Sequence, residues 1–358
     1  MNKIRKLNKF TLTNIKSYGI VILAFVILYP MQNFGMISHS ISGQLVPICT
    51  YIVMAISLNL TVGFLGELSL GHAGFMSVGA FTGVITAVCL KEIVTSAALR
   101  LLIAIITGGV FAGVAGLLIG IPVLRLRGDY LAIVTLAFGE IIKNIINCLY
   151  VGVDASGLHM SMTSAEALGM VKGKLILNGP QGAVGNTKIA TFTAGILLIL
   201  FALFIVLNLV NSKTGRAVTA IRDNRIAAES VGISVTRYKL TAFIISAVLA
   251  GMAGALYAMN FSTIAAKKFD FNTSILVLVF VVLGGMGNIF GSIIATALLY
   301  MLPELLREYS DYRMLIYSII LILVMLITNS EKAKQMREQF KARFAAYRRK
   351  KTDKREAK

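Results

Sequence analysis

The chain has 358 residues, of which 57% are hydrophobic and only 14% are charged. Soluble globular proteins carry about 25% charged residues, so this composition excludes an ordinary soluble domain and indicates a protein that crosses a membrane several times. The net charge of +19 does not indicate nucleic-acid binding. The basic residues lie in short connections between apolar stretches and in residues 332–358, as in the cytoplasmic parts of membrane proteins.

Apolar stretches long enough to cross a bilayer follow one another along the chain. A crossing needs about 20 apolar residues. The first stretch follows several lysines, but its apolar core is longer than the ~7–15 residues of a signal peptide, so we interpret it as a retained helix. The sequence predicts membrane stretches at 18–34, 44–65, 69–90, 99–124, 130–147, 189–210, 239–260, 273–302 and 313–328.

The distribution of Lys and Arg predicts the orientation. Both tails, the turn 125–128 and the loop 211–239 are basic, which favours the cytoplasm for all four. Nine simple crossings would put the tails on opposite sides, so one stretch must be interpreted differently. Gly284, Gly285 and Gly287 break the stretch 273–302, and the 12 residues up to the break, 273–284, rise only about 18 Å. The sequence therefore predicts a short crossing followed by another helix, or a re-entrant hairpin, and about ten membrane segments in all.

A second apolar stretch, residues 54–81, is also interrupted by glycines, and it carries Glu67 and His72. Gly-broken segments at two places predict a mid-membrane site lined by unwound backbone. The alternative is that the glycines only permit close helix packing, as expected for pairs such as Gly79/Gly83. The candidate pathway residues are Asn59, Glu67, Gly71, His72, Gly74, Glu140, Gly285 and Gly287.

Motifs of catalysis are absent from the sequence. It contains no phosphate-binding loop, no HExxH and no nucleophile elbow. Cys49, Cys89 and Cys148 match no metal spacing. We therefore expect no catalytic residue, no metal site and no enzyme activity, and uphill transport would need a partner or an ion gradient. An ion-coupled carrier would use ionisable residues within its helices; Glu140 and Lys143 share one helix face and could instead pair with each other.

The polar loop 211–239 contains its own short helix signal. Asp223 or Asn224 is the expected N-cap, and Gly232 follows the expected end. This helix would present a small apolar face suited to docking a protein, formed by Ile226, Ala227, Ser230 and Val231. Alternatively, the helix lies on anionic lipid with the help of Arg216, Arg222 and Arg225.

Several blocks of the sequence resemble a known family. IAAESVG (226–232) is similar to the EAAxxxG loop of ABC importer permeases: Ala227, Ala228 and Gly232 match, and Ile226 stands where Glu is usual. Over about residues 40–330 the chain resembles the LivM-type permeases of branched-chain amino acid importers. The matching blocks are 58–81, 124–143, 215–258 and 282–298, with NGPQG (178–182) as a looser match.

This resemblance implies an all-α ABC permease fold in the bacterial cytoplasmic membrane, and the basic tails predict that both termini are cytoplasmic. The domains are a basic N-tail (1–16), a permease domain (17–328) with an external loop (149–187), and a basic C-tail (329–358). The implied partners are a second homologous permease, two ATPase subunits that hold ATP and Mg²⁺, an extracytoplasmic binding protein and membrane lipid, and no nucleic acid; this chain itself holds no cofactor. The implied ATPase-coupling residues are Gly215, Arg216, Arg222, Asp223, Asn224, Ala227, Ala228 and Gly232.

The resemblance implies leucine, isoleucine or valine as cargo. Backbone N–H groups near Gly71 or Gly287 would meet the carboxylate of the amino acid, and Glu67 or Glu140 its ammonium group. Two alternatives stay open. The same machine could carry urea, a short amide or a sugar, or the chain could be an ion-coupled carrier that works alone.

Overall fold

The computed structural model describes residues 9–36, 38–126, 128–154, 157–170, 173–307 and 312–329. The chain forms two compact units, 1–301 and 302–358, which are described separately. The start of the predicted N-tail, Arg127 of the predicted basic turn, and the predicted C-tail from residue 330 onward lie outside the described residues.

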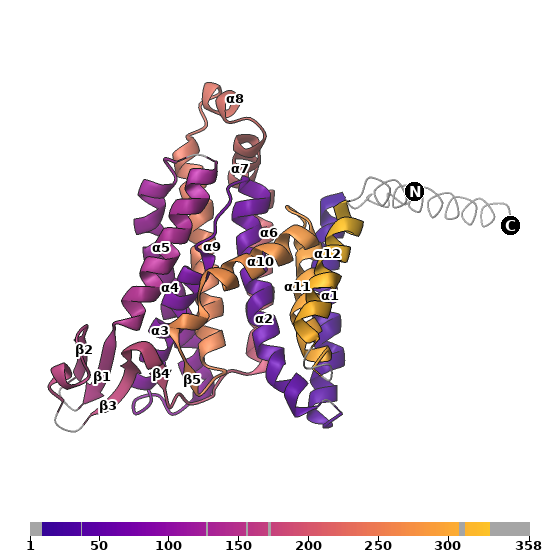
Figure 1. Ribbon diagram of the computed structural model, residues 1–358. Helices are drawn as coiled ribbons and strands as arrows, with labels where there is room; N and C mark the ends of the chain where they lie inside the picture. Colours follow the sequence, from indigo (N-terminus) through magenta and orange to yellow (C-terminus); the bar gives the residue numbers. More distant parts are fainter. Residues whose placement is uncertain are drawn as a thin grey trace, which may run out of the picture. The chain divides into compact units, whose positions relative to one another are not determined.

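Helices make up most of the described chain, which confirms the predicted helical class (Figure 1). The first unit contains α1 (Lys9–Asn33), α2 (His39–Asn59), the π-helix η1 (Leu60–Leu65), α3 (His72–Cys89), α4 (Ala97–Val123), α5 (Asp129–Asn147), α6 (Phe192–Asn211), α7 (Lys213–Asp223), α8 (Arg225–Ser230), α9 (Val235–Ala258) and α10 (Phe271–Gly284). The boundary between the units falls within α11 (Ile289–Leu305), and α12 (Arg313–Asn329) belongs to the second unit.

Within the described residues, 5 helical segments are long and apolar enough to cross a membrane. They are His39–Leu65, His72–Cys89, Ala97–Val123, Phe192–Asn211 and Val235–Ala258, and each corresponds to a stretch predicted from the sequence. The predicted total of about ten segments stays a prediction. The break in 273–302 is confirmed, because α10 ends at Gly284 after 14 residues, about 21 Å of helix, and α11 begins at Ile289.

Small residues bring α3, α4 and α9 into close contact. A Cβ atom on Gly79 would overlap the backbone of Gly251, and one on Gly254 would overlap the carbonyl oxygen of Met76. Only glycine permits backbones to approach this closely. The packing role expected for Gly79 is therefore what the structure shows, and the contacts of α9 with α3 and α4 form the centre of the first unit.

A five-stranded antiparallel sheet was not predicted from the sequence. Its first four strands lie in the expected external loop, and β5 lies in the connection between α9 and α10. Its order is β2-β1-β3-β4-β5. Figure 1 shows the sheet at the opposite end of the first unit from α7 and α8. The strands are β1 (Tyr150–Asp154), β2 (Gly157–Ser161), β3 (Lys174–Asn178), β4 (Ala183–Val184) and β5 (Thr263–Ile264). NGPQG forms the turn between β3 and β4, closed by a hydrogen bond of 2.7 Å from the Asn178 amide to Gln181 Oε1.

The close approach of α9 to α3 generates a stability prediction. Gly254→Val should lower the unfolding temperature in detergent, because a side chain forced against the Met76 backbone costs about 1–3 kcal/mol or more. Gly43→Val in α2 is the matched control, since a Cβ there meets no atom within 4 Å. Heating followed by size-exclusion chromatography measures the folded fraction, and equal losses for the two variants would contradict the packing argument.

Candidate functional site

The loop between α6 and α9 folds into two short helices. Ser212 caps α7, accepting a hydrogen bond from Gly215 N at 3.2 Å. Asn224 caps α8, accepting from Ala227 N at 3.1 Å. Gly232 follows α8 with φ +82°, a left-handed conformation that favours glycine. The short helix, its Asn224 cap and its glycine end are therefore confirmed.

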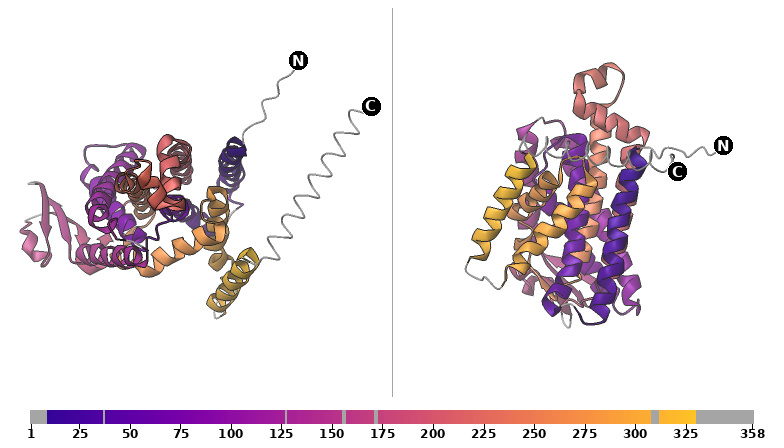
Figure 2. Two further views of the ribbon diagram at one scale, coloured as in Figure 1. Left: turned by 90° about the horizontal axis from the view of Figure 1, so that it is seen from above. Right: turned by 90° about the vertical axis from the view of Figure 1, so that its right-hand side faces the viewer.

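Two large apolar side chains are exposed on α8 and just after it. Ile226 is 80% exposed and Val231 is 75% exposed, and Ala227 and Ser230 are exposed beside them. Figure 2 shows α7 and α8 projecting beyond the ends of the neighbouring helices. Exposed apolar side chains gathered on a projecting helix are typical of a protein contact. The apolar face predicted for this helix is confirmed.

Ala228, which the sequence analysis placed among the coupling residues, does not belong to that exposed face. It is 4% exposed and packs with Ile221 and Val235, with the partly buried Ile233 and Tyr238 beside them. These residues form a small core that holds α8 against α7 and the start of α9. Ala228 therefore stabilises the loop from inside.

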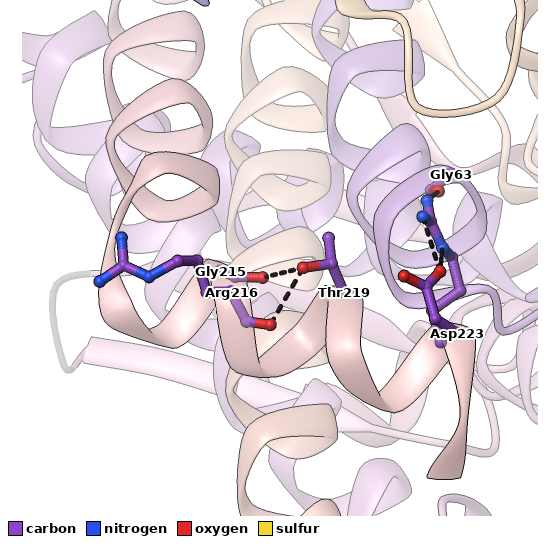
Figure 3. A network of polar contacts seen from close by, with 6 residues as sticks. Gly63, Gly215, Arg216, Thr219 and Asp223 are labelled. Atoms are coloured by element: carbon purple, nitrogen blue, oxygen red, sulfur yellow. Dashed lines mark hydrogen bonds and ion pairs between the residues drawn. The ribbon is translucent and has the colours of Figure 1, made fainter. Parts of the chain in front are cut away.

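The two arginines of α7 have different partners, and Figure 3 shows Arg216 pointing away from Gly63 and Asp223. Arg216 makes a hydrogen bond of 3.4 Å to the carbonyl oxygen of Asn211. Arg222 reaches across to η1, where its Nη1 donates to the carbonyl oxygen of Gly63 at 3.0 Å. Asp223 holds the same guanidinium, accepting from Nε at 3.1 Å and from Nη2 at 2.9 Å. A residue of the loop is thus bonded directly to the first Gly-broken stretch.

Asn59 joins the two broken stretches. It is completely buried; its Oδ1 accepts from Gly287 N at 2.8 Å, and its Nδ2 donates to Ser292 Oγ at 2.9 Å. A Cβ on Gly63 would overlap both Asn59 Oδ1 and Gly287 N. Gly285 and Gly287 turn the chain between α10 and α11 with φ +95° and +77°. Asn59 and Gly287, two of the candidate pathway residues, are therefore in direct contact, and this contact holds the two broken stretches together.

The glycines that begin α3 lie against α5. A Cβ on Gly71 would overlap the carbonyl oxygen of Thr135, and one on Gly74 would lie 2.9 Å from Gly139 Cα. His72 is buried, and its Nε2 is 2.7 Å from Ser57 Oγ. Gly71, His72 and Gly74 therefore pack the start of α3 against neighbouring helices.

Both acidic candidates are engaged in ion pairs. Glu67, in the unwound segment before α3, pairs with Lys239 of α9. Glu140 pairs with Lys143, the partner expected from their spacing, and its Oε1 also accepts from Phe271 N at 3.2 Å at the start of α10. A cavity of about 10 Å³ lies beside Glu140, between α3, α5 and α10, enough for about one water molecule.

These features define a multi-pass helical membrane protein with two broken helices and a projecting loop that carries an exposed apolar face. The chain matches the family described as "Branched-chain amino acid transport system / permease component" over residues 40–328 and belongs to that family.

Relatives with described roles agree with this assignment. The chain is 35% identical over 295 residues to the high-affinity branched-chain amino acid transport system permease protein LivM of Escherichia coli and to that of Salmonella typhimurium, covering 77% of this chain and 66% of each relative. It thus spans just under two thirds of their length. A fructose import permease protein, FruG of Bifidobacterium longum, is 26% identical over 135 residues, 35% of this chain and 40% of the relative. No solved structure matches the chain.

The burial of Ala228 generates a second prediction. Ala228→Asp should open the loop, because a polar group placed in this small core costs about 1–3 kcal/mol. Trypsin should then cleave near Arg222 and Arg225 about tenfold faster in detergent-solubilised protein. Ala227→Asp, the same change on the exposed neighbour, should leave the cleavage rate unchanged. Equal cleavage of the two variants would show that Ala228 does not stabilise the loop.

Proposed function

We propose that the chain is the membrane permease subunit of an ATP-driven importer of leucine, isoleucine and valine. The observation that carries this proposal is the 35% identity to two branched-chain amino acid permease proteins over 295 residues. The family match over residues 40–328 includes the loop with the exposed apolar face. The chain supplies the path through the membrane and has no catalytic role.

Two ATPase subunits provide the energy in this proposal. They hold ATP and Mg²⁺, and one of them receives the tip of α8, where Ile226 and Val231 are exposed. A second, homologous permease completes the path. The end that carries α7 and α8 then faces the cytoplasm together with both termini, as the basic residues of the loop and tails favour.

The opposite end of the first unit receives the cargo from an extracytoplasmic binding protein. The five-stranded sheet lies at that end and offers a folded surface where the sequence suggested a long loop. Residues 149–187 therefore serve as the docking region.

The pathway candidates divide into two groups. Asn59, Gly71, His72, Gly74, Gly285 and Gly287 hold the broken helices by packing and hydrogen bonds. Glu67 and Glu140 carry charge but are paired with Lys239 and Lys143. This pairing speaks against an ion-coupled carrier, because both acidic side chains are already engaged.

A sugar is the second cargo class worth testing, because a more distant relative is a fructose import permease protein. Uptake of labelled leucine and fructose, each with its own binding protein, distinguishes the two cargoes. We expect leucine to be transported and fructose not.

The exposed tip of α8 generates the third prediction. Ile226→Asp should reduce co-purification of the ATPase about tenfold, because a charge replaces an apolar anchor of the interface. Ile93→Asp is the matched control: Ile93 is 78% exposed but lies in the connection between α3 and α4, at the other end of the first unit. Both variants should remain monodisperse. Recovery of the unsubstituted chain alone, with leucine transport in liposomes without ATP, would overturn the proposed function.

A further inference from the structure

The segment Gly63–Glu67 comprises the last residues of η1 and the two residues that follow it. It is held from two sides, by α7 within the loop and by the start of α9 just after it. Arg222 is in the last turn of α7 and donates to the carbonyl oxygen of Gly63. Lys239 is near the start of α9 and pairs with Glu67. The two contacts connect parts of the chain that are 159 and 172 residues apart. We call this pair of contacts the loop clamp.

The Arg222 contact is preorganised. Asp223 occupies Nε and Nη2 of the guanidinium, which leaves Nη1 for the Gly63 carbonyl. Gly66 has φ +78°, and a Cβ there would lie 2.6 Å from Arg222 Cγ. The backbone of the segment is thus shaped to let the arginine stem pass.

The Lys239 contact is protected from solvent. The Lys239 side chain is 4% exposed and that of Glu67 is 16% exposed. Breaking a buried ion pair by removing one partner leaves an uncompensated charge. Lys239 therefore ties the start of α9 firmly to the same segment.

The clamped segment leads directly to both broken helices. On one side, Gly63 packs against Gly287, and Asn59 bonds the turn between α10 and α11. On the other side, the chain continues from Glu67 into the first residues of α3. A displacement of the segment therefore moves the start of α3 and the turn before α11 together.

Resting on the proposed function, we propose that Arg222 and Lys239 are positioning residues of the transport cycle. They transmit movement of α7 and α8 to the broken helices through Gly63 and Glu67. The ATPase acts on the tip of α8, and the loop clamp converts that movement into a change in the membrane part.

The test measures ATP hydrolysis and leucine uptake together, in proteoliposomes that contain the whole complex and are supplied with its binding protein. Arg222→Ala should lower uptake about tenfold, as expected for loss of a charge-assisted hydrogen bond. The ATPases should still co-purify, and the ratio of ATP hydrolysed to leucine transported should rise. A normal ratio with normal uptake would overturn the inference.

Arg237→Ala is the matched control for this variant. Arg237 is an exposed arginine on α9, two residues before Lys239, and among the described residues its side chain has no polar partner. Its replacement should change neither uptake nor the ratio. A loss equal to that of Arg222→Ala would attribute the effect to general loss of positive charge and overturn the inference.

The ion pair is tested by charge reversal. Lys239→Glu and Glu67→Lys should each reduce coupled uptake, and the double variant should restore at least half of it. A double variant that folds, binds the ATPases and stays uncoupled would overturn the role of this pair. Absence of any ATPase from the unsubstituted complex would overturn the proposed function itself, and the loop clamp with it. The two failures are therefore distinguishable.

Discussion

Unwound backbone inside a membrane protein must find hydrogen-bond partners within the protein, because lipid offers none. This requirement organises the first unit. At the end of η1, at the start of α3 and in the turn after α10, side chains from other helices satisfy backbone groups that lack a partner within their own helix. These contacts are Leu70 N to Thr135 Oγ1, Ala73 N to Ser274 Oγ, Gly287 N to Asn59 Oδ1, and Arg222 Nη1 to the Gly63 carbonyl.

The short side chains among these, Thr135, Ser274 and Asn59, reach the backbone only when the helices lie very close together. Glycine provides that closeness: Gly71 packs on α5, and a Cβ on Gly284 would lie 2.5 Å from the Ser292 backbone. The two explanations of the glycines, close packing and unwound backbone, are therefore linked. Close packing brings Thr135 and Asn59 within reach of the peptide groups that the breaks expose.

Local signals in the sequence were sufficient for the features that depend on neighbouring residues. The apolar lengths predicted the membrane helices, the glycines at 284–287 predicted the end of α10, and Asn224 with Gly232 predicted the limits of α8. Contacts over long sequence distances carry no such signal. Arg222 looked like one of several loop arginines, and only folding places it against Gly63. The strands β4 and β5 were missed because they have two residues each and pair across a long intervening segment.

Ala228 shows why the site was harder to predict than the fold. In this helix of six residues, the helical pattern placed Ala227 on the apolar face. The family resemblance named both Ala227 and Ala228 as coupling residues and did not say which of them turns inward. The tertiary contacts with Ile221 and Val235 decide it. Since this small core holds α8 to α7 and to α9, a force on the exposed tip is shared by both helices. Both helices contact the segment Gly63–Glu67, α7 through Arg222 and α9 through Lys239. The compact loop and the clamped segment are therefore parts of one mechanical connection.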